Sequence, residues 1–329
     1  MITDNPAIQH RALSELLHAE WEHRSTELIF LPVGGASWSY RSGDWFVNVR
    51  DGIDDGRDVS LSFEMAGTLR DRCGLDFLLT PTRTVSGHAS AKLDGFVVVV
   101  MPFVDGVVRG RDPFARHELA EAVEWVSRIH EATPDVADVP LSIRPFEDWF
   151  AEPLRDALDR TCEDPVSSPF GTRLRDLVAP YRDALLDSLA EHEALVHGLT
   201  QRDHAFVVTH GEPDPQNVLE AADGTRWLID LGEIALAPRE LDLYVLRKAA
   251  RPEDGQLVGD LDPDLARYYE NRWHLSEITE YLDHLSRSDG ADVPEGDRWD
   301  WRHEPEPEWR TEGERAWGLL RYFLSRHLD

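Results

Sequence analysis

The sequence contains few cysteines and no long apolar run. Only two of its 329 residues are cysteine, Cys73 and Cys162, and they form no Cys-x-x-Cys pair. This usage excludes a disulfide framework and a cysteine zinc site, and it favours a reducing compartment. The longest apolar run, near residues 96–104, is too short to cross a bilayer, and the N-terminus lacks the pattern of a signal peptide. We therefore expect a cytoplasmic protein with no membrane partner.

Positive charge is also scarce. Lys and Arg total 34 against 63 Asp and Glu, which gives a formal net charge of −29, and the only lysines are Lys92 and Lys248. A field of this sign repels nucleic-acid phosphates and anionic lipid headgroups, so we expect neither partner. Hydrophobic residues make up 41% of the chain, which is enough for a packed core. The length predicts one large domain or two modest ones.

The first hundred residues alternate between helix and strand patterns. Residues 96–103 are apolar on both faces of a predicted strand, which predicts that this strand is central in its sheet. A glycine-containing turn at 33–37 predicts a hairpin between 29–32 and 44–50. The predicted helices are 7–21 and 58–73, and the predicted strands are 29–32, 44–50, 77–80 and 96–103. We expect this small α+β lobe to end at residue 104.

From residue 105 onward the pattern is mainly helical, interrupted by short strands on both sides of a polar loop. Pro134 ends one predicted helix and Pro180 kinks another. An acidic, tryptophan-containing segment at 286–310 is expected to be an irregular loop. The predicted helices are 119–129, 170–197, 262–285 and 312–327, and the predicted strands are 206–210, 217–221 and 226–230.

The polar loop gathers the side chains that phosphoryl transfer requires. Residues 208–217 read Val-Thr-His-Gly-Glu-Pro-Asp-Pro-Gln-Asn, and Asp230 ends the next apolar strand. In phosphoryl transfer a carboxylate orients or deprotonates the attacking hydroxyl, and Asn and Asp oxygens hold Mg²⁺. Each residue by itself is equally typical of a polar loop with a capping Asn, so the prediction depends on their combination.

This combination resembles the aminoglycoside phosphotransferase family. His210-Gly211-Glu212 through Asn217 resembles the family's His-Gly-Asp-x-x-x-x-Asn loop, which is related to the protein-kinase catalytic loop. Asp230 falls where the family has its magnesium-binding Asp. Residues 235–243 resemble its Pro-x-x-x-Asp-Leu segment, whose Asp, here Asp242, helps to fix the loop. The resemblance runs from about Phe30 to Leu285 and is closest in wording to actinobacterial members grouped near spectinomycin phosphotransferases.

The resemblance implies a bilobal, protein-kinase-like α+β fold. Residues 1–104 would form a small β-rich N-lobe that binds nucleotide, and residues 105–329 a larger, mainly helical C-lobe with the catalytic loop and the acceptor region. It also implies a role for each candidate residue. The catalytic candidates are Glu212, Asp214 and His210; the ATP or GTP candidates are Gly34, Gly35, Ser37, Asn48, Arg50, Met101 and Phe103; the Mg²⁺ candidates are Asn217 and Asp230.

Two positions depart from the family's pattern. Glu212 stands in place of the usual Asp and is one methylene longer, which moves the carboxylate by about 1.5 Å. Asn48 stands in place of the lysine that contacts the α and β phosphates. Arg50, two residues along and on the same strand face, is the candidate replacement, although its planar guanidinium is not equivalent to an ammonium. Glu64 is the candidate for the helix glutamate that normally pairs with this lysine, and a place on a solvated helix face is an equally good interpretation of it.

The resemblance predicts transfer of the γ-phosphoryl group of ATP or GTP to a hydroxyl of a small cationic molecule, such as an aminocyclitol or aminoglycoside. Two alternatives stay open. Asn48 and Glu212 also suit a pseudoenzyme that binds nucleotide without turnover, and the acceptor could be an ordinary metabolite such as an amino alcohol or a sugar. Trp299, Trp301 and Trp309 suit either cation–π contact with a cationic sugar or packing over the helical lobe.

Overall fold

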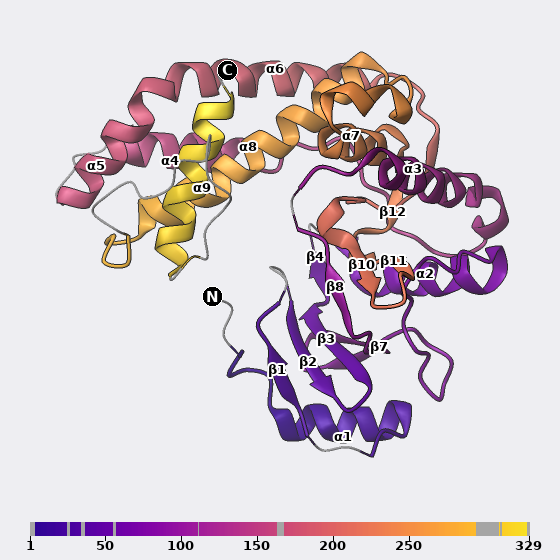
Figure 1. Ribbon diagram of the computed structural model, residues 1–329. Coiled ribbons are helices and arrows are strands. Elements are labelled where there is room, and N and C mark those ends of the chain that lie inside the picture. The colour runs from indigo at the N-terminus through magenta and orange to yellow at the C-terminus, as the bar shows by residue number, and fades with distance from the viewer. Residues whose placement is uncertain are drawn as a thin grey trace. The chain divides into compact units, whose positions relative to one another are not determined.

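The computed structural model describes residues 4–24, 27–33, 37–54, 57–110, 112–162, 168–293, 309 and 311–327. The chain separates into two compact units. The sheet unit is formed by Ile2–Pro145 and His204–Asp262, and the helical unit by Phe146–Asp203 and Pro263–Asp329. The sheet-rich N-terminal part and helical C-terminal part confirm the α+β class (Figure 1). The lobe boundary expected at residue 104 lies inside the sheet unit and stays a prediction.

A five-stranded antiparallel sheet forms the N-terminal part of the sheet unit. Its strand order is β1-β2-β3-β7-β6, so β7 is an interior strand, as its two-sided apolar pattern predicts. The pairing of β3 with β7 aligns Asn48 with Val99 and Arg50 with Val97. The strands are β1 Ile29–Leu31, β2 Trp38–Ser42, β3 Trp45–Asp51, β6 Ala91–Leu93 and β7 Phe96–Pro102.

The two faces of this sheet bury different apolar clusters. Val98 and Val100 pack with helix α1, His10–Trp21, which lies against the sheet in Figure 1. Val97 and Val99 instead join the cluster of helix α2, Val59–Cys73. Because directly paired residues in an antiparallel sheet share a face, Asn48 and Arg50 lie on the α2 face.

The predicted helix 58–73 is confirmed as α2, which is capped at both ends. The Asp58 side chain accepts a hydrogen bond from Ser60 N at 3.0 Å, which caps the N-terminus. Gly74 ends the helix in the left-handed conformation, with φ +67°.

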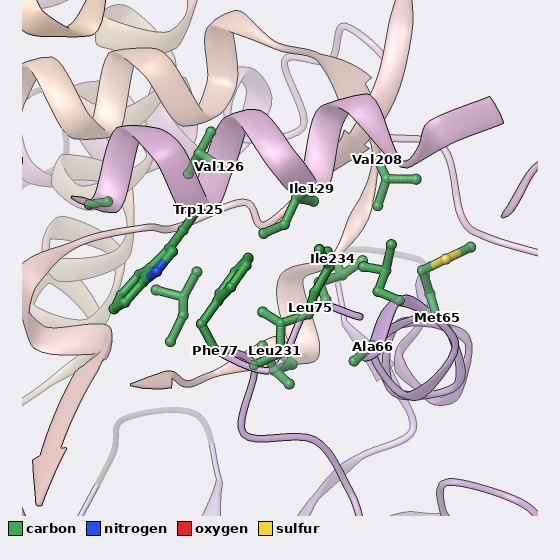
Figure 2. Close-up of a cluster of buried hydrophobic side chains, with 14 of the residues drawn as sticks. Met65, Ala66, Leu75, Phe77, Trp125, Val126, Ile129, Val208, Leu231 and Ile234 are labelled. Atoms are coloured by element: carbon green, nitrogen blue, oxygen red, sulfur yellow. The ribbon is translucent and has the colours of Figure 1, made fainter. Parts of the chain in front are cut away.

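The remainder of the sheet unit shares one apolar core. Figure 2 shows Met65 and Ala66 of α2 beside Leu231 and Ile234, and the rings of Phe77 and Trp125 stack with centroids 5.3 Å apart. This core therefore ties α2 to the segment that follows Asp230. The other helices and strands of the unit are α3 Arg116–Glu131, α7 Glu240–Ala249, β4 Ile53–Asp54, β5 Arg57–Asp58, β8 Gly106–Val108, β9 Phe206–Thr209, β10 Val218–Ala221, β11 Arg226–Leu228 and β12 Ala235–Pro238.

The helical unit has its own apolar core. The kink predicted at Pro180 is a full break in the structure, because a short 3-10 turn, Ala179–Tyr181, separates α5, Pro169–Val178, from α6, Arg182–Thr200. Trp309 packs against the core, and a Cβ at Gly318 of α9 would overlap its indole ring, which supports the packing alternative for this tryptophan. Trp299 and Trp301 lie outside the described residues. The helices are α4 Ala151–Cys162, α5 Pro169–Val178, α6 Arg182–Thr200, α8 Pro263–Arg287 and α9 Glu312–His327.

Two strand predictions were wrong. Residues 77–80 form no strand and contribute only an isolated bridge between Leu78 and Leu228. The predicted hairpin between 29–32 and 44–50 is also wrong, because β2 lies between these strands and pairs with both. No helix of the described ranges is long and apolar enough to span a membrane.

Candidate functional site

The candidate catalytic loop connects β9 to β10 inside the sheet unit. His210 follows β9 and is fully buried; its ring Nε2 lies 3.0 Å from Ile229 O, and its Nδ1 lies 3.3 Å from Glu212 N. Nε2 therefore donates and Nδ1 accepts. Burial lowers the pKa of His210, so the imidazole is neutral at pH 7. The neutral ring therefore holds the loop through one hydrogen bond at each of its two nitrogens.

The side chain of Asp242, near the start of α7, anchors the loop by binding the loop's backbone N–H groups. Its carboxylate accepts hydrogen bonds from His210 N at 2.9 Å, from Gly211 N at 2.8 Å and from His130 Nε2 at 2.9 Å. Burial by itself would raise the pKa of Asp242, but the His130 hydrogen bond, the two nearby histidines and the Gly211 N–H outweigh it and lower the pKa. The resemblance implied this contact between Asp242 and the loop.

Gly211 brings the loop against the segment that follows Asp230. Its φ is +96°, which favours glycine, and a Cβ at this position would lie only 2.8 Å from Glu233 O. The catalytic loop and residues 231–233 therefore touch through backbone, and any side chain at 211 would force them apart.

Glu212 presents its carboxylate at the surface of this loop. The surrounding protein, followed by the charges of Asp230 and Asp214, raises the pKa of Glu212 to about 7. Three carboxylates are thus close enough to repel one another. A carboxyl group that titrates near neutral pH is suited to act as a general base.

Asp214 and Asn217 hold the far side of the loop. Asp214 Oδ1 accepts from Gln216 N at 3.0 Å and caps the 3-10 turn Pro215–Asn217. Asn217 Nδ2 donates to Glu212 O at 2.9 Å, so its Oδ1 is the oxygen available to a cation. Asn217 O accepts from Ile229 N at 2.9 Å, which brings the chain leading to Asp230 beside the loop.

Asp230 adopts the left-handed conformation, with φ 59° and ψ 60°, which is uncommon for a residue other than glycine. Its side chain is 49% exposed, so a carboxylate oxygen is accessible to a ligand. Asn217 and Asp230 together offer the oxygen donors that Mg²⁺ prefers, so the residues fit this cation. The described ranges hold no group of three or more His, Cys, Asp or Glu placed to bind a metal, so further ligands would come from the nucleotide or water.

Arg50 lies inside the site. Only 6% of its side chain is exposed, and its Nη1 is 3.7 Å from Asp230 Oδ1 while its Nη2 is 3.9 Å from Glu233 Oε1. The guanidinium passes close to the backbone at Gly232, where a Cβ would overlap Nη1. Asn48, on the same strand face, donates from Nδ2 to Ser37 Oγ at 2.7 Å. The structure therefore brings a cation to Asp230 from position 50.

Glu64 does not serve as the partner of a β3 cation, so that prediction was wrong. Its carboxylate pairs with Arg83 Nη1 at 3.2 Å and accepts from Ala89 N at 2.5 Å. Asn48 offers no charge to attract it, and Arg83 takes that place. The usual Lys–Glu pair is therefore missing: Asn48 binds Ser37, and Glu64 binds Arg83.

Of the remaining nucleotide candidates, Met101 lies on the sheet and Phe103 directly follows β7. Met101, near the end of β7, is half-buried and pairs in register with Phe46. Phe103 N donates to Asp44 O at 2.7 Å, and its ring centroid is 4.0 Å from Arg41 Cζ. Gly34 and Gly35 lie outside the described residues. The roles of all these residues in nucleotide binding stay predictions.

Three residues of the site were not predicted from the sequence. Glu233 Oε2 accepts from Arg57 Nη2 at 2.8 Å and from Arg144 Nη2. Arg57 is 176 residues from Glu233, and Arg144 is 89 residues from it. No local spacing joins residues so far apart. Glu233 itself was visible only as the end of the Asp-Leu-Gly-Glu run.

Comparison with known proteins identifies a similar sequence and similar folds. "Protein StrN" from Streptomyces griseus is 26% identical over 330 residues, covering 93% of this chain and 97% of that protein. The fold is similar to that of spectinomycin phosphotransferase in complex with ADP and spectinomycin, with a TM-score of 0.68 at 19% identity, covering 87% of this chain and 92% of that chain. It is also similar to aminoglycoside 2'-phosphotransferase-IIIa in its GDP complex, with a TM-score of 0.59 at 15% identity, covering 96% and 98%.

The two structural similarities show a kinase-like fold shared with phosphotransferases. The profile of the family named APH, described as "Phosphotransferase enzyme family", matches residues 71–285. This match covers more than half of the chain and includes the catalytic loop, Asp230 and Asp242. The chain therefore belongs to the APH phosphotransferase enzyme family.

Proposed function

We propose that this phosphotransferase moves the γ-phosphoryl group of ATP or GTP to a hydroxyl of a small cationic molecule of the aminocyclitol or aminoglycoside type, in the cytoplasm. One observation carries the proposal. Asn217 joins Glu212 and the chain leading to Asp230, because its Nδ2 donates to Glu212 O and its backbone O accepts from Ile229 N. Burial, followed by the charges of Asp230 and Asp214, raises the pKa of Glu212 to about 7. A base and two cation ligands thereby occupy one small region.

Nucleotide binding is supported by the similar solved structures. Those structures contain ADP, AMP or GDP. In this chain Asn217 Oδ1 and the Asp230 carboxylate would hold Mg²⁺, which when bound neutralises charge on the phosphates. Arg50, with its guanidinium beside Asp230, would supply the remaining cation near the phosphates.

The chain's own residues divide the work at the acceptor. Glu212 accepts or orients the proton of the attacking hydroxyl, and its pKa of about 7 suits a base at neutral pH. Asp214 is the second carboxylate that could take this role, although its Oδ1 caps the following turn. His210 and Asp242 do not contact the acceptor in this scheme; they hold the loop in position.

The acceptor class is supported by charge and by the similar proteins. Two similar structures hold spectinomycin or kanamycin. A net charge of −29 attracts a cationic acceptor and repels an anionic one. A second candidate function, nucleotide binding without turnover, is favoured by one observation, the uncharged Asn48 and its hydrogen bond to Ser37.

Mass spectrometry of the acceptor tests the proposal. The protein is incubated with Mg-ATP or Mg-GTP and a panel of aminocyclitols, aminoglycosides, amino alcohols and neutral sugars. We expect one phosphoryl group to be added to a cationic aminocyclitol or aminoglycoside. Addition to an amino alcohol or sugar alone would contradict the acceptor class, and nucleotide binding with no product would favour the non-catalytic function.

A further inference from the structure

We propose that Glu233 is a positioning residue whose carboxylate, clamped by Arg57 and Arg144, fixes the Asp230 turn and the Arg50 guanidinium. This inference rests on the proposed function, because Asp230 and Arg50 have their metal and nucleotide roles there. Its local part, that Glu233 holds the turn, concerns the protein without ligand.

The clamp joins three separate parts of the sheet unit. Arg57 belongs to β5, just before α2, and only 6% of its side chain is exposed. Arg144 is 11% exposed, and its backbone N donates to Leu236 O at 2.8 Å, which fixes it beside β12. Both guanidinium groups bind the same oxygen of Glu233. Removing one partner of a nearly buried ion pair costs far more than removing one partner of a surface pair, because it leaves a buried charge uncompensated.

The turn after Asp230 needs such support because its backbone is strained. A non-glycine residue in the left-handed region is strained and persists only where its surroundings fix it. Leu231 and Ile234 are anchored in the apolar core beside Met65 and Ala66 (Figure 2). Ser62 Oγ also donates to Ile234 O at 2.8 Å. These contacts hold the apolar residues of the turn, and the Glu233 carboxylate fixes its polar side by binding Arg57 and Arg144.

Glu233 also connects the clamp to Arg50. The Arg50 guanidinium lies between two carboxylates, with Nη2 3.9 Å from Glu233 Oε1 and Nη1 3.7 Å from Asp230 Oδ1. Oε2 of Glu233 binds the clamp while Oε1 faces Arg50. Loss of the Glu233 charge would therefore release the turn and remove one of the two charged carboxylates beside Arg50.

Glu233→Gln is the test, because it keeps the shape of the side chain and removes only its charge. Two quantities are measured on the full-length protein: amide hydrogen exchange of residues 229–236 without ligand, and calorimetric affinity for ADP with and without Mg²⁺. We expect faster exchange in this segment. We also expect the Mg²⁺-dependent gain in ADP affinity to fall about tenfold or more, as when groups that orient metal ligands are removed.

Glu118→Gln is the matched control. Glu118, on α3, is a 16% exposed carboxylate that pairs with Arg109 and Arg226, much as Glu233 pairs with its two arginines. A general loss of stability would affect both variants equally, whereas a positioning role affects only Glu233→Gln in residues 229–236 and in the Mg²⁺-dependent step.

Wild-type exchange in residues 229–236 of Glu233→Gln overturns the proposal. So does a Mg²⁺-dependent affinity equal to that of Glu118→Gln. If the wild type binds no nucleotide at all, the proposed function fails, and the hydrogen exchange of the two variants alone decides whether Glu233 fixes the turn.

Discussion

At the residue scale, the two neighbouring carboxylates Glu212 and Asp214 differ in their hydrogen bonds and in their surroundings. Asp214 caps a turn through Gln216 N, while the pKa of Glu212 is raised to about 7. We expect Glu212→Gln to lower phosphoryl transfer by about 10²–10⁴-fold with little change in nucleotide affinity, because a base acts on the acceptor rather than on the nucleotide. Steady-state kinetics with calorimetry measures both quantities.

Asp214→Asn is the matched control for that substitution. It removes a carboxylate of the same loop and weakens a turn cap, so we expect a smaller loss of turnover. If Asp214→Asn abolishes turnover while Glu212→Gln retains it, Asp214 is the base and the assignment within the loop is wrong.

Gly232 offers a way to displace Arg50 without removing it. A Cβ at this position would overlap Arg50 Nη1, and the backbone of Gly232 is not at positive φ, so alanine suits the backbone. We expect Gly232→Ala to weaken nucleotide binding to a similar degree as Arg50→Ala, and to add little to it. Calorimetric titration of nucleotide into the wild type, the two single variants and the double variant gives the affinities for a double-mutant cycle. Fully additive losses would show that Gly232 acts independently of Arg50.

At the element scale, contiguous patterns were predicted well and short polar strands were not. Helices α2 and α3 and strand β7 follow clear apolar patterns, and the structure confirms them. Strand β2, read as Trp-Ser-Tyr-Arg-Ser, is short and mostly polar, and only its pairing with β1 and β3 makes it a strand. Tertiary pairing of this kind has no local signature.

The candidate site shows the same division. His210, Glu212, Asp214 and Asn217 share one loop, so their spacing predicted them together. The clamp on Glu233 draws its arginines from two distant segments, and a single sequence carries no signal for such contacts. Only the folded structure shows that Arg57 and Arg144 bind the Glu233 carboxylate.

The anchoring of the catalytic loop by α7 gives a prediction for an element as a whole. Asp242→Asn removes the charge that binds His130 and the loop N–H groups in a fully buried position, so we expect a loss of about 3–5 kcal/mol in unfolding free energy at pH 7. Because folding lowers the pKa of Asp242, its contribution is present above about pH 4 and is lost as the pH falls further.

Urea unfolding between pH 3 and pH 7 measures this dependence. The difference between wild type and Asp242→Asn should shrink at the acidic end. Asp223→Asn is the control, because Asp223 is exposed and its carboxylate accepts only a local hydrogen bond from Thr225 N. A difference of constant size across the pH range would contradict the role of the ionised Asp242.

At the scale of the whole molecule, acidic charge is in large excess. Even if all 34 Lys and Arg paired with acidic groups, 29 of the 63 Asp and Glu would be left over. Their mutual repulsion opposes folding and is screened by salt. We therefore expect the melting temperature to rise by about a few degrees between 10 mM and 500 mM NaCl. A melting temperature that falls with salt would mean that ion pairs outweigh the repulsion.

Calorimetric binding of Mg-ATP and Mg-GTP to the wild type, Asn217→Ala and Asp230→Ala tests the assigned site most directly. Both substitutions remove an oxygen ligand from the proposed cation, one an amide and one a half-exposed carboxylate. We predict that the wild type binds at least one of these nucleotides more tightly with Mg²⁺ than without it, and that both variants lose this Mg²⁺-dependent gain. Wild-type Mg²⁺-dependent affinity in both variants would contradict the metal site on which the proposed function depends.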